Sequence, residues 1–144
     1  MSMDREKTLE DIRRGISSID QEIVSLLNKR AGLSIEVGEI KSRSRDIVFK
    51  PFREKEILSR LLVNNNGPLP KEHLRAIYRE IFSSSRSLQQ KQRVVYLGPE
   101  GTFSYFAGVE YLGHSADYFP QNSLDEVFRA VDAREAELGI IPLE

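Results

Sequence analysis

Several charged or amide side chains fall where a helix would otherwise present only apolar residues. Arg30 interrupts a row of leucine, isoleucine and valine residues spaced by three and four, and Lys41 lies three turns later on nearly the same face. A later row of the same kind carries Ser85, with Gln89 one turn further on. Because a buried cation without a partner is very costly, the row that carries Arg30 must offer it an acid or an anionic ligand.

One acid stands close to this set in the sequence. Glu54 follows Arg53 in the first turn of a helix that Pro51 opens. Glu54 cannot readily neutralise both Arg30 and Lys41, because Arg53 beside it adds a further positive charge. Several cations and neutral donors converging inside a helical bundle predict a pocket for a small molecule that bears more than one carboxylate.

Each of these residues also has a purely structural interpretation. Arg30 could set the register of a coiled coil, and Lys41 could be a solvated cation favoured by the helix dipole. Glu54 could be a first-turn acid, and Ser85 and Gln89 could be polar residues at a fraying helix end. Taken singly, each residue fits the structural interpretation; taken together, they favour the pocket.

A second candidate site is the stretch VVYLGPEGTFS at residues 94–104. It has the pattern of a buried strand that enters a glycine-rich loop with two hydroxyl side chains, Thr102 and Ser104. Such a loop can cradle an anion. Only residues 105–144 follow it, so it has little to close against, and a plain strand-to-helix turn is the interpretation we adopt for this chain.

Three helices must position the polar residues of the first set. The first is expected from about Arg5 to about Ser42, roughly 57 Å long, since no proline occurs before Pro51. Its apolar seam consists of Leu9, Ile12, Ile16, Ile19, Ile23, Leu26, Leu33, Val37 and Ile40. The second helix begins at Pro51 and stops at the breaker cluster NNNGP, and the third begins near Pro70 and runs out into the polar stretch SSSRSLQQKQR.

After this polar stretch the period of the apolar residues changes. The order strand, helix, strand, helix, strand is expected, with a helix capped by Asn122 or Ser123 and a second buried strand in ELGIIPLE. We therefore predict an all-α three-helix domain at residues 1–91, followed at 92–144 by an incomplete α/β (βαβαβ) segment with a parallel sheet. The charge supports this division, because residues 1–93 carry 19 Lys and Arg against 13 Asp and Glu, whereas residues 94–144 carry 2 against 9.

Composition excludes several classes of chemistry. The chain has no cysteine and two histidines, so a thiolate nucleophile, a Ser/His relay and a metal site are poorly supplied, and neither a metal nor a cofactor is expected. No apolar run is long enough to cross a bilayer, and the start MSMDREKTLED is charged. We therefore expect a cytoplasmic protein without a membrane partner. We expect no nucleic-acid partner either, since cations alternate with acids along the helices.

The length of the first helix predicts a homodimer. The second and third helices, near 14 and 20 residues, would reach only about 21 and 30 Å, so they cannot cover the seam of the first. A second copy is the simplest remedy, with the two long helices crossing in an intertwined bundle. A non-catalytic dimerisation or regulatory module is the alternative that this pattern also allows.

Residues 8–90 resemble the all-helical class of chorismate mutases, in the form fused to prephenate dehydratase in the bifunctional P-proteins of phenylalanine synthesis, a branch of the shikimate pathway. The matching stretches are LEDIRRGISSIDQEIVSLLNKRAGLSIEVGEIK, VFKPFREKEIL and IFSSSRSLQQ. The stretches GPEGTFS and GIIPLE resemble the beginning of the dehydratase domain. The resemblance implies an isomerase that converts chorismate to prephenate, with dehydratase (lyase) activity expected only of a longer parent chain.

The resemblance also implies residue roles. Lys41 and Gln89 would hydrogen-bond the ether oxygen of the breaking bond, and Glu54 would hold the ring hydroxyl. The substrate carboxylates would be bound by Arg30, by Arg13 from the partner chain and by the nearby Arg53, with Ser85 in support. Some mutases carry an acid three residues before the Arg-Glu pair, whereas this chain has Lys50, which we leave out of the active set.

Overall fold

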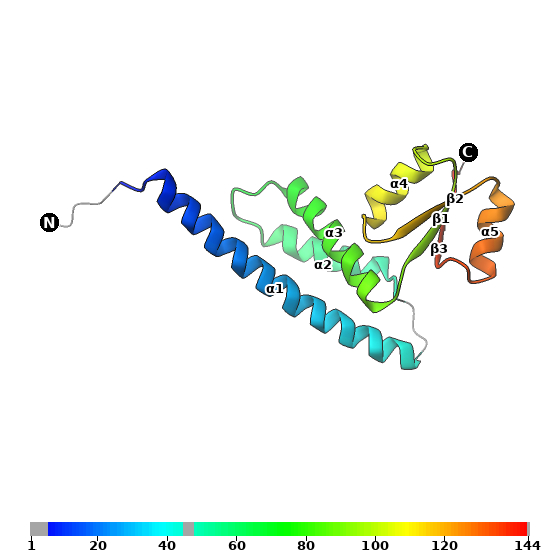
Figure 1. Cartoon of the computed structure of the whole chain (residues 1–144), viewed down its shortest axis with the longest axis horizontal. Coiled ribbons are helices and arrows are strands. Elements are labelled where there is room, and N and C mark those ends of the chain that lie inside the picture. The colour runs from blue at the N-terminus through cyan, green and yellow to red at the C-terminus, as the bar shows by residue number, and fades with distance from the viewer. Residues whose placement is uncertain (1–5, 45–47, 144) are drawn as a thin grey trace. The chain divides into compact units, whose positions relative to one another are not determined.

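The computed structural model describes residues 6–44 and 48–143, and the chain divides into two units, Met1–Leu33 and Ser34–Glu144. The elements follow the predicted order of three helices and then strand, helix, strand, helix, strand (Figure 1). They are α1 (Leu9–Ser44), α2 (Pro51–Val63), α3 (Lys71–Gln89), β1 (Arg93–Leu97), α4 (Phe103–Leu112), β2 (Asp117–Gln121), α5 (Leu124–Asp132) and β3 (Leu138–Ile140).

Helix α1 begins at Leu9 because the preceding residue caps it. The Thr8 hydroxyl accepts a hydrogen bond from the Asp11 backbone N–H at 3.2 Å, and the Asp11 carboxylate accepts one from the Thr8 N–H at 3.0 Å. This reciprocal pair satisfies two of the free donors at the helix start. The predicted start, Arg5, lies outside the described residues. With 36 residues, α1 is about 54 Å long.

The second and third helices begin where the prolines predicted. Pro51 occupies the first turn of α2, and Pro70 is the N-cap of α3. The extended backbone of Pro70 suits a residue that precedes a helix, and its missing N–H costs nothing in either position. Helices α2 and α3 pack against each other, joined by the NNNGP turn that the sequence marked as a breaker.

The end of α1 meets the end of α3 at a very close approach. Ser34 and Gly38 are the buried residues of α1, and the hydroxyl oxygens of Ser34 and Ser85 lie 2.6 Å apart. A Cβ atom placed on Gly38 would lie 2.7 Å from the Cα atom of Gln89 and 2.9 Å from its carbonyl oxygen. Only glycine therefore allows the two helices to come this close.

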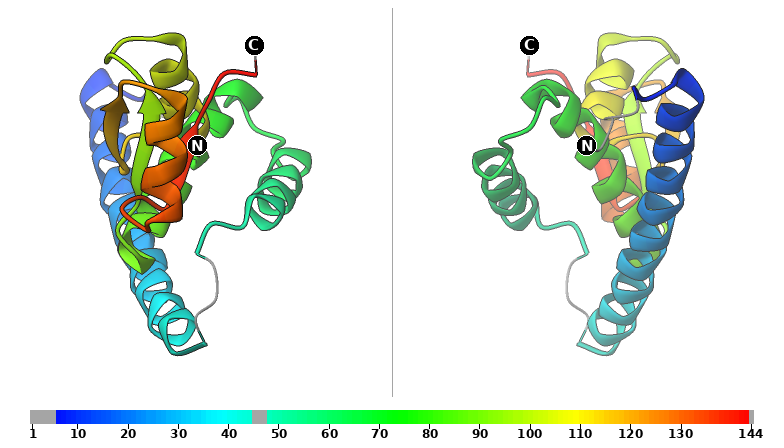
Figure 2. Two further views of the ribbon diagram at one scale, coloured as in Figure 1. Left: turned by 90° about the vertical axis from the view of Figure 1, so that its right-hand side faces the viewer. Right: turned by 90° about the vertical axis from the view of Figure 1, so that its left-hand side faces the viewer.

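The strands within residues 93–140 form a three-stranded parallel sheet in the order β2-β1-β3. The central strand β1 is buried along its middle, as its continuous apolar run predicts for a strand covered on both faces. Val95 points to one face and packs with Val127 and Ala130 of α5, while the Tyr96 ring on the other face lies 5.5 Å from the Tyr105 ring of α4. Helices α4 and α5 thus cover opposite faces of the sheet, and α5 lies in front of it in the left view of Figure 2.

Two details of the α/β segment refine the prediction. Of the two candidate caps, Ser123 is the N-cap of α5, and its hydroxyl accepts from the Glu126 N–H at 3.2 Å. Strand β3 was expected to be buried but is only half-buried, because it lies at the edge of the sheet with one neighbouring strand.

None of the helices described is long and apolar enough to cross a membrane.

Replacing Gly38 by alanine should destabilise the protein. The added methyl group must push the backbone of Gln89 away, so we expect the free energy of unfolding to fall by roughly 1–3 kcal/mol. The matched control is Gly32→Ala in the same helix, where an added Cβ has nothing within 4 Å and the better helix propensity adds up to about 1 kcal/mol. Denaturant titrations at one protein concentration compare the two, and equal stabilities would contradict the close-approach argument.

The pH dependence of stability should reflect the junction between β1 and β3. Burial opposes ionisation of Glu137, but hydrogen bonds from the Arg93 side chain and backbone hold the pKa of Glu137 below its ordinary value of 4.5. A carboxylate with a lowered folded-state pKa stabilises the fold above pH 4.5, and this contribution is lost as the pH falls through the folded-state pKa.

Replacing Glu137 by glutamine should therefore remove part of the acid dependence. Denaturant titrations from neutral pH to about pH 3 should give a shallower fall in stability for Glu137→Gln than for the wild type. Glu135→Gln, at an exposed neighbour, should keep the wild-type slope. The same slope in all three proteins would show that the Arg93–Glu137 pair contributes nothing.

Candidate functional site

Two of the predicted site residues lie side by side at the end of α3. The Gln89 amide nitrogen is 3.5 Å from the Ser85 hydroxyl oxygen, and that hydroxyl contacts Ser34 of α1 at 2.6 Å. Both side chains are half-buried rather than frayed into solvent. The structural interpretation of Ser85 and Gln89 as polar residues of a fraying end is therefore wrong.

The side-chain amide of Gln89 has unused hydrogen-bonding capacity. Its oxygen atom is buried and accepts no hydrogen bond from the residues that the structure describes, and its nitrogen makes only the long contact to Ser85. Nitrogen and oxygen of an amide are interchangeable by rotation, so either a donor or an acceptor can face this position. A buried polar group left in this state is costly unless a ligand satisfies it.

Lys41 lies close to the same junction. It follows Gly38 by three residues, so it is on the face of α1 that meets the end of α3. Its ammonium group is half-buried and donates to the Val48 carbonyl oxygen at 3.5 Å, which is the long end of the range for a hydrogen bond. The interpretation of Lys41 as a solvated helix-end cation does not fit this half-buried position.

Glu54 pairs with a cation that the sequence analysis did not single out. Its two carboxylate oxygens accept hydrogen bonds from Nη1 of Arg86 at 2.5 and 2.6 Å. Arg86 is among the most buried charged residues described, with 4% of its surface exposed, whereas Glu54 is half-buried. Glu54, the acid that was expected near Arg30 and Lys41, thus forms an ion pair with a residue of α3.

Arg86 has two further neighbours. Its Nη2 donates to the Leu112 carbonyl oxygen at 2.7 Å, and its guanidinium carbon lies 5.0 Å from the centre of the Phe49 ring. These contacts compensate for removing a positive charge from water. One signal in the sequence could have pointed to Arg86: with Glu80 and Ser83 it forms a polar row at a spacing of three, on a helix whose other stripe is apolar.

A cavity of about 630 Å³ lies beside this ion pair. Glu54 and Arg86 line it together with residues of α2, α3 and α4, among them Lys55, Arg75 and Tyr111. Ser85, Gln89 and Lys41 do not line it. This cavity therefore does not join Glu54 to the junction at Ser85 and Gln89.

For the three predicted arginines the structure gives the exposure of each side chain. Arg53 is exposed on the first turn of α2. Arg13 and Arg30 belong to the unit Met1–Leu33, where Arg13 is exposed and Arg30 is half-buried. Their roles toward a substrate stay predictions.

The glycine-rich loop behaves as the turn that we adopted. Thr102 is the N-cap of α4, and its hydroxyl donates to the Leu97 carbonyl oxygen at 3.2 Å, which ties the loop back to β1.

Across residues 6–44 and 48–143, no group of three or more histidine, aspartate or glutamate side chains is arranged to hold a metal ion.

Comparisons with known proteins agree with this architecture. The family model described as chorismate mutase type II matches residues 12–90, and the model described as prephenate dehydratase matches residues 94–144. The chain is similar to proteins named bifunctional chorismate mutase/prephenate dehydratase from three organisms. It is 42% identical over 140 residues to that of Aquifex aeolicus, 39% over 141 residues to that of Stutzerimonas stutzeri and 35% over 144 residues to that of Neisseria gonorrhoeae.

These alignments cover 94%, 94% and 100% of this chain, respectively, and 39% of each relative, so the chain spans about two fifths of their length. The resemblance inferred from the sequence motifs is confirmed. Because the first model matches more than half of the residues, the chain belongs to the chorismate mutase type II family.

Proposed function

We propose that residues 12–90 catalyse the rearrangement of chorismate to prephenate, a step toward phenylalanine. The observation that carries the proposal is the junction of α1 and α3, where Gln89 keeps a buried amide available beside the helix face that bears Lys41. The family match over the same residues supports it. The rearrangement of chorismate uses one substrate and requires no nucleophile.

The protein's task in such a rearrangement is positioning and charge stabilisation. The flexible enolpyruvyl group must be held over the ring in a chair geometry, and negative charge builds on the ether oxygen as the bond breaks. Lys41 and Gln89 supply an ammonium and an amide donor for that oxygen. Donors held in place by helix packing do not need to reorganise during the reaction.

The remaining residues of the proposed site bind the ground state. Arg30, Arg53 and the partner chain's Arg13 would hold the substrate carboxylates, Ser85 would support them, and Glu54 would accept from the ring hydroxyl. Arginine suits this role because its planar fork matches a carboxylate with two hydrogen bonds. Such contacts tighten substrate binding, whereas the contacts to the ether oxygen strengthen only in the transition state.

A homodimer would complete this site. The apolar seam of α1 from Leu9 to Leu33 is exposed in the single chain, with each of its seven residues exposed by 48% or more. Burying a large side chain of this kind contributes about 1.5–3 kcal/mol, so a second α1 packed along the seam would gain much free energy. The same packing would bring Arg13 of one chain toward Lys41 and Gln89 of the other.

The magnitude of the proposed catalysis is reasonable. A hydrogen bond to a charged group contributes about 1.5–3 kcal/mol. If two or three such bonds strengthen in the transition state, roughly 3–9 kcal/mol follows, which corresponds to about 10² to 10⁶ in rate. We further propose a cytoplasmic protein with a mutase domain at 1–91, and dehydratase activity only in a parent chain that extends the segment 92–144.

The direct test incubates the purified chain with chorismate and follows the ultraviolet absorbance of the substrate. Acid treatment of the product should yield phenylpyruvate, the compound that prephenate forms in acid. Loss of chorismate without this product, or no loss at all, would favour the alternative of a non-catalytic dimerisation module.

Removing either donor to the ether oxygen should lower turnover. We expect Lys41→Ala and Gln89→Ala each to reduce kcat by about ten-fold or more while leaving the fold intact, since each variant loses one charge-assisted hydrogen bond in the transition state. Gln90→Ala is the matched control, because Gln90 is exposed one residue further on. Near-normal kcat in a folded Lys41 or Gln89 variant would remove that residue from its role.

Sharing of sites between chains can be tested by mixing. At chorismate concentrations well below the wild-type KM, a Lys41→Ala chain and an Arg13→Ala chain are each expected to lose most of their activity, because the first lowers kcat and the second raises KM. After subunit exchange, one site of every mixed dimer is intact. Activity should then recover to about a quarter of the wild-type value, because about half of the dimers are mixed and each has one intact site of two.

The control for this experiment mixes Lys41→Ala with Gln89→Ala. Both changes affect residues that one chain contributes to its own site, so no mixed dimer regains an intact site. Mass spectrometry of differently labelled chains confirms the exchange. Exchange without recovery in the first mixture would argue against sharing.

A further inference from the structure

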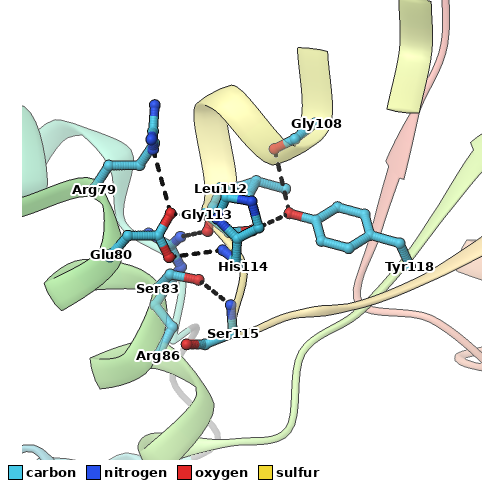
Figure 3. A network of polar contacts seen from close by, with 10 residues as sticks. All are labelled: Arg79, Glu80, Ser83, Arg86, Gly108, Leu112, Gly113, His114, Ser115 and Tyr118. Carbon is cyan, nitrogen blue, oxygen red and sulfur yellow. Dashed lines mark hydrogen bonds and ion pairs between the residues drawn. The ribbon is translucent and has the colours of Figure 1, made fainter. Parts of the chain in front are cut away.

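One face of α3 receives the loop that follows α4. Glu80, Ser83 and Arg86 are spaced by three residues, so they lie on one side of the helix. Glu80 accepts hydrogen bonds from the backbone of His114 at 2.9 Å and contacts its ring nitrogen at 2.7 Å, and Ser83 accepts from the backbone of Ser115 at 3.0 Å. Figure 3 shows these side chains pointing toward residues 112–115, which we call the docking loop.

The docking loop fits closely against α3. Gly113 has a φ of +77°, and a Cβ atom placed on it would lie 2.5 Å from the Cβ atom of Ser83. The hydroxyl of the half-buried Tyr118 donates to the Gly113 carbonyl oxygen at 2.6 Å from the opposite side. The loop is therefore held between α3 and β2.

Arg86 links this docking loop to the proposed mutase site. One nitrogen of its guanidinium donates to both carboxylate oxygens of Glu54, and the other donates to the Leu112 carbonyl oxygen. The group is planar and rigid, so the position of one nitrogen fixes the position of the other. A shift of the docking loop would thus move or release the carboxylate of Glu54.

We propose that Arg86 is a positioning residue of the mutase site, which holds the Glu54 carboxylate for the ring hydroxyl of the substrate and makes its position depend on docking of residues 112–115 against α3. This inference rests on the proposed function, in which Glu54 binds that hydroxyl. It assigns to residues 94–144 a part in mutase substrate binding, although none of them is placed in the mutase site itself.

The first experiment measures chorismate kinetics of the full chain with Arg86→Leu and Arg86→Lys. Because Glu54 binds the ground state, KM should rise about ten-fold or more in Arg86→Leu while kcat changes by less than about three-fold. Arg86→Lys keeps a charge but not the fork, so its KM should be intermediate. Wild-type KM in either folded variant overturns the proposal. If Arg86→Leu fails to fold, Arg86→Lys decides.

A substrate analogue separates positioning from a general structural effect. An analogue of chorismate without the ring hydroxyl makes no contact with Glu54, so its inhibition constant should be the same for the wild type and Arg86→Leu. A distorted site would bind both molecules more weakly. Equal weakening of chorismate and analogue overturns the assignment of Arg86 to Glu54.

The link to the docking loop has its own matched pair of variants. Gly113→Ala places a methyl group against Ser83 and should raise KM in the same direction as Arg86→Lys. Gly101→Ala introduces the same kind of backbone strain, at a φ of +86°, but its Cβ has nothing within 4 Å, so KM should stay unchanged. Wild-type KM in Gly113→Ala overturns the link. A wild-type chain that leaves chorismate unchanged would instead refute the proposed function, which makes the two failures distinguishable.

Discussion

A buried positive charge organises much of this molecule. The guanidinium of Arg86 can leave water only if its donors find acceptors, and it finds them in Glu54 of α2 and the Leu112 carbonyl at the end of α4, with the Phe49 ring across its face. Two segments that are far apart in the sequence, residues 49–54 and the end of α4, must therefore converge on the end of α3. Since both of them meet one side chain, the packing of α2 and α4 is coupled even though the two helices come from different parts of the chain.

The second constraint is steric and lies on another side of α3. Gly38 allows the backbone of Gln89 to approach α1, and the Ser34 and Ser85 hydroxyls form a polar contact beside it. Beside this close approach the amide oxygen of Gln89 is buried and has no hydrogen-bond partner among the described residues. Packing and chemistry are joined here: the same contact that brings the helices together creates the polar group that a ligand can satisfy.

The elements were predictable because their signals are local. Pro51, Pro70 and the NNNGP cluster delimit α2 and α3, and the change of period after residue 91 marks the sheet. Ser85 and Gln89 were also recognisable, since they interrupt an apolar row. For Arg86 the spacing of three with Glu80 and Ser83 marks a polar row, but the burial of its guanidinium depends on Phe49 and Leu112, which no spacing within α3 reveals. For the same reason the commitment of Glu54 to α3 could not be anticipated from its position in the first turn of α2.

Helix α3 carries two polar rows that serve different neighbours: Ser85 and Gln89 face α1, while Glu80, Ser83 and Arg86 face the docking loop. The composition therefore changes near residue 91, but side chains of α3 before this boundary form hydrogen bonds with residues after it. A shortened chain that ends there would expose a row evolved for contact, leaving Arg86 with one acceptor fewer and Ser83 and Glu80 with none of their partners from residues 112–115. Engineering an independent helical unit would thus require redesign of that row, with shorter or apolar side chains, rather than a simple choice of where to cut.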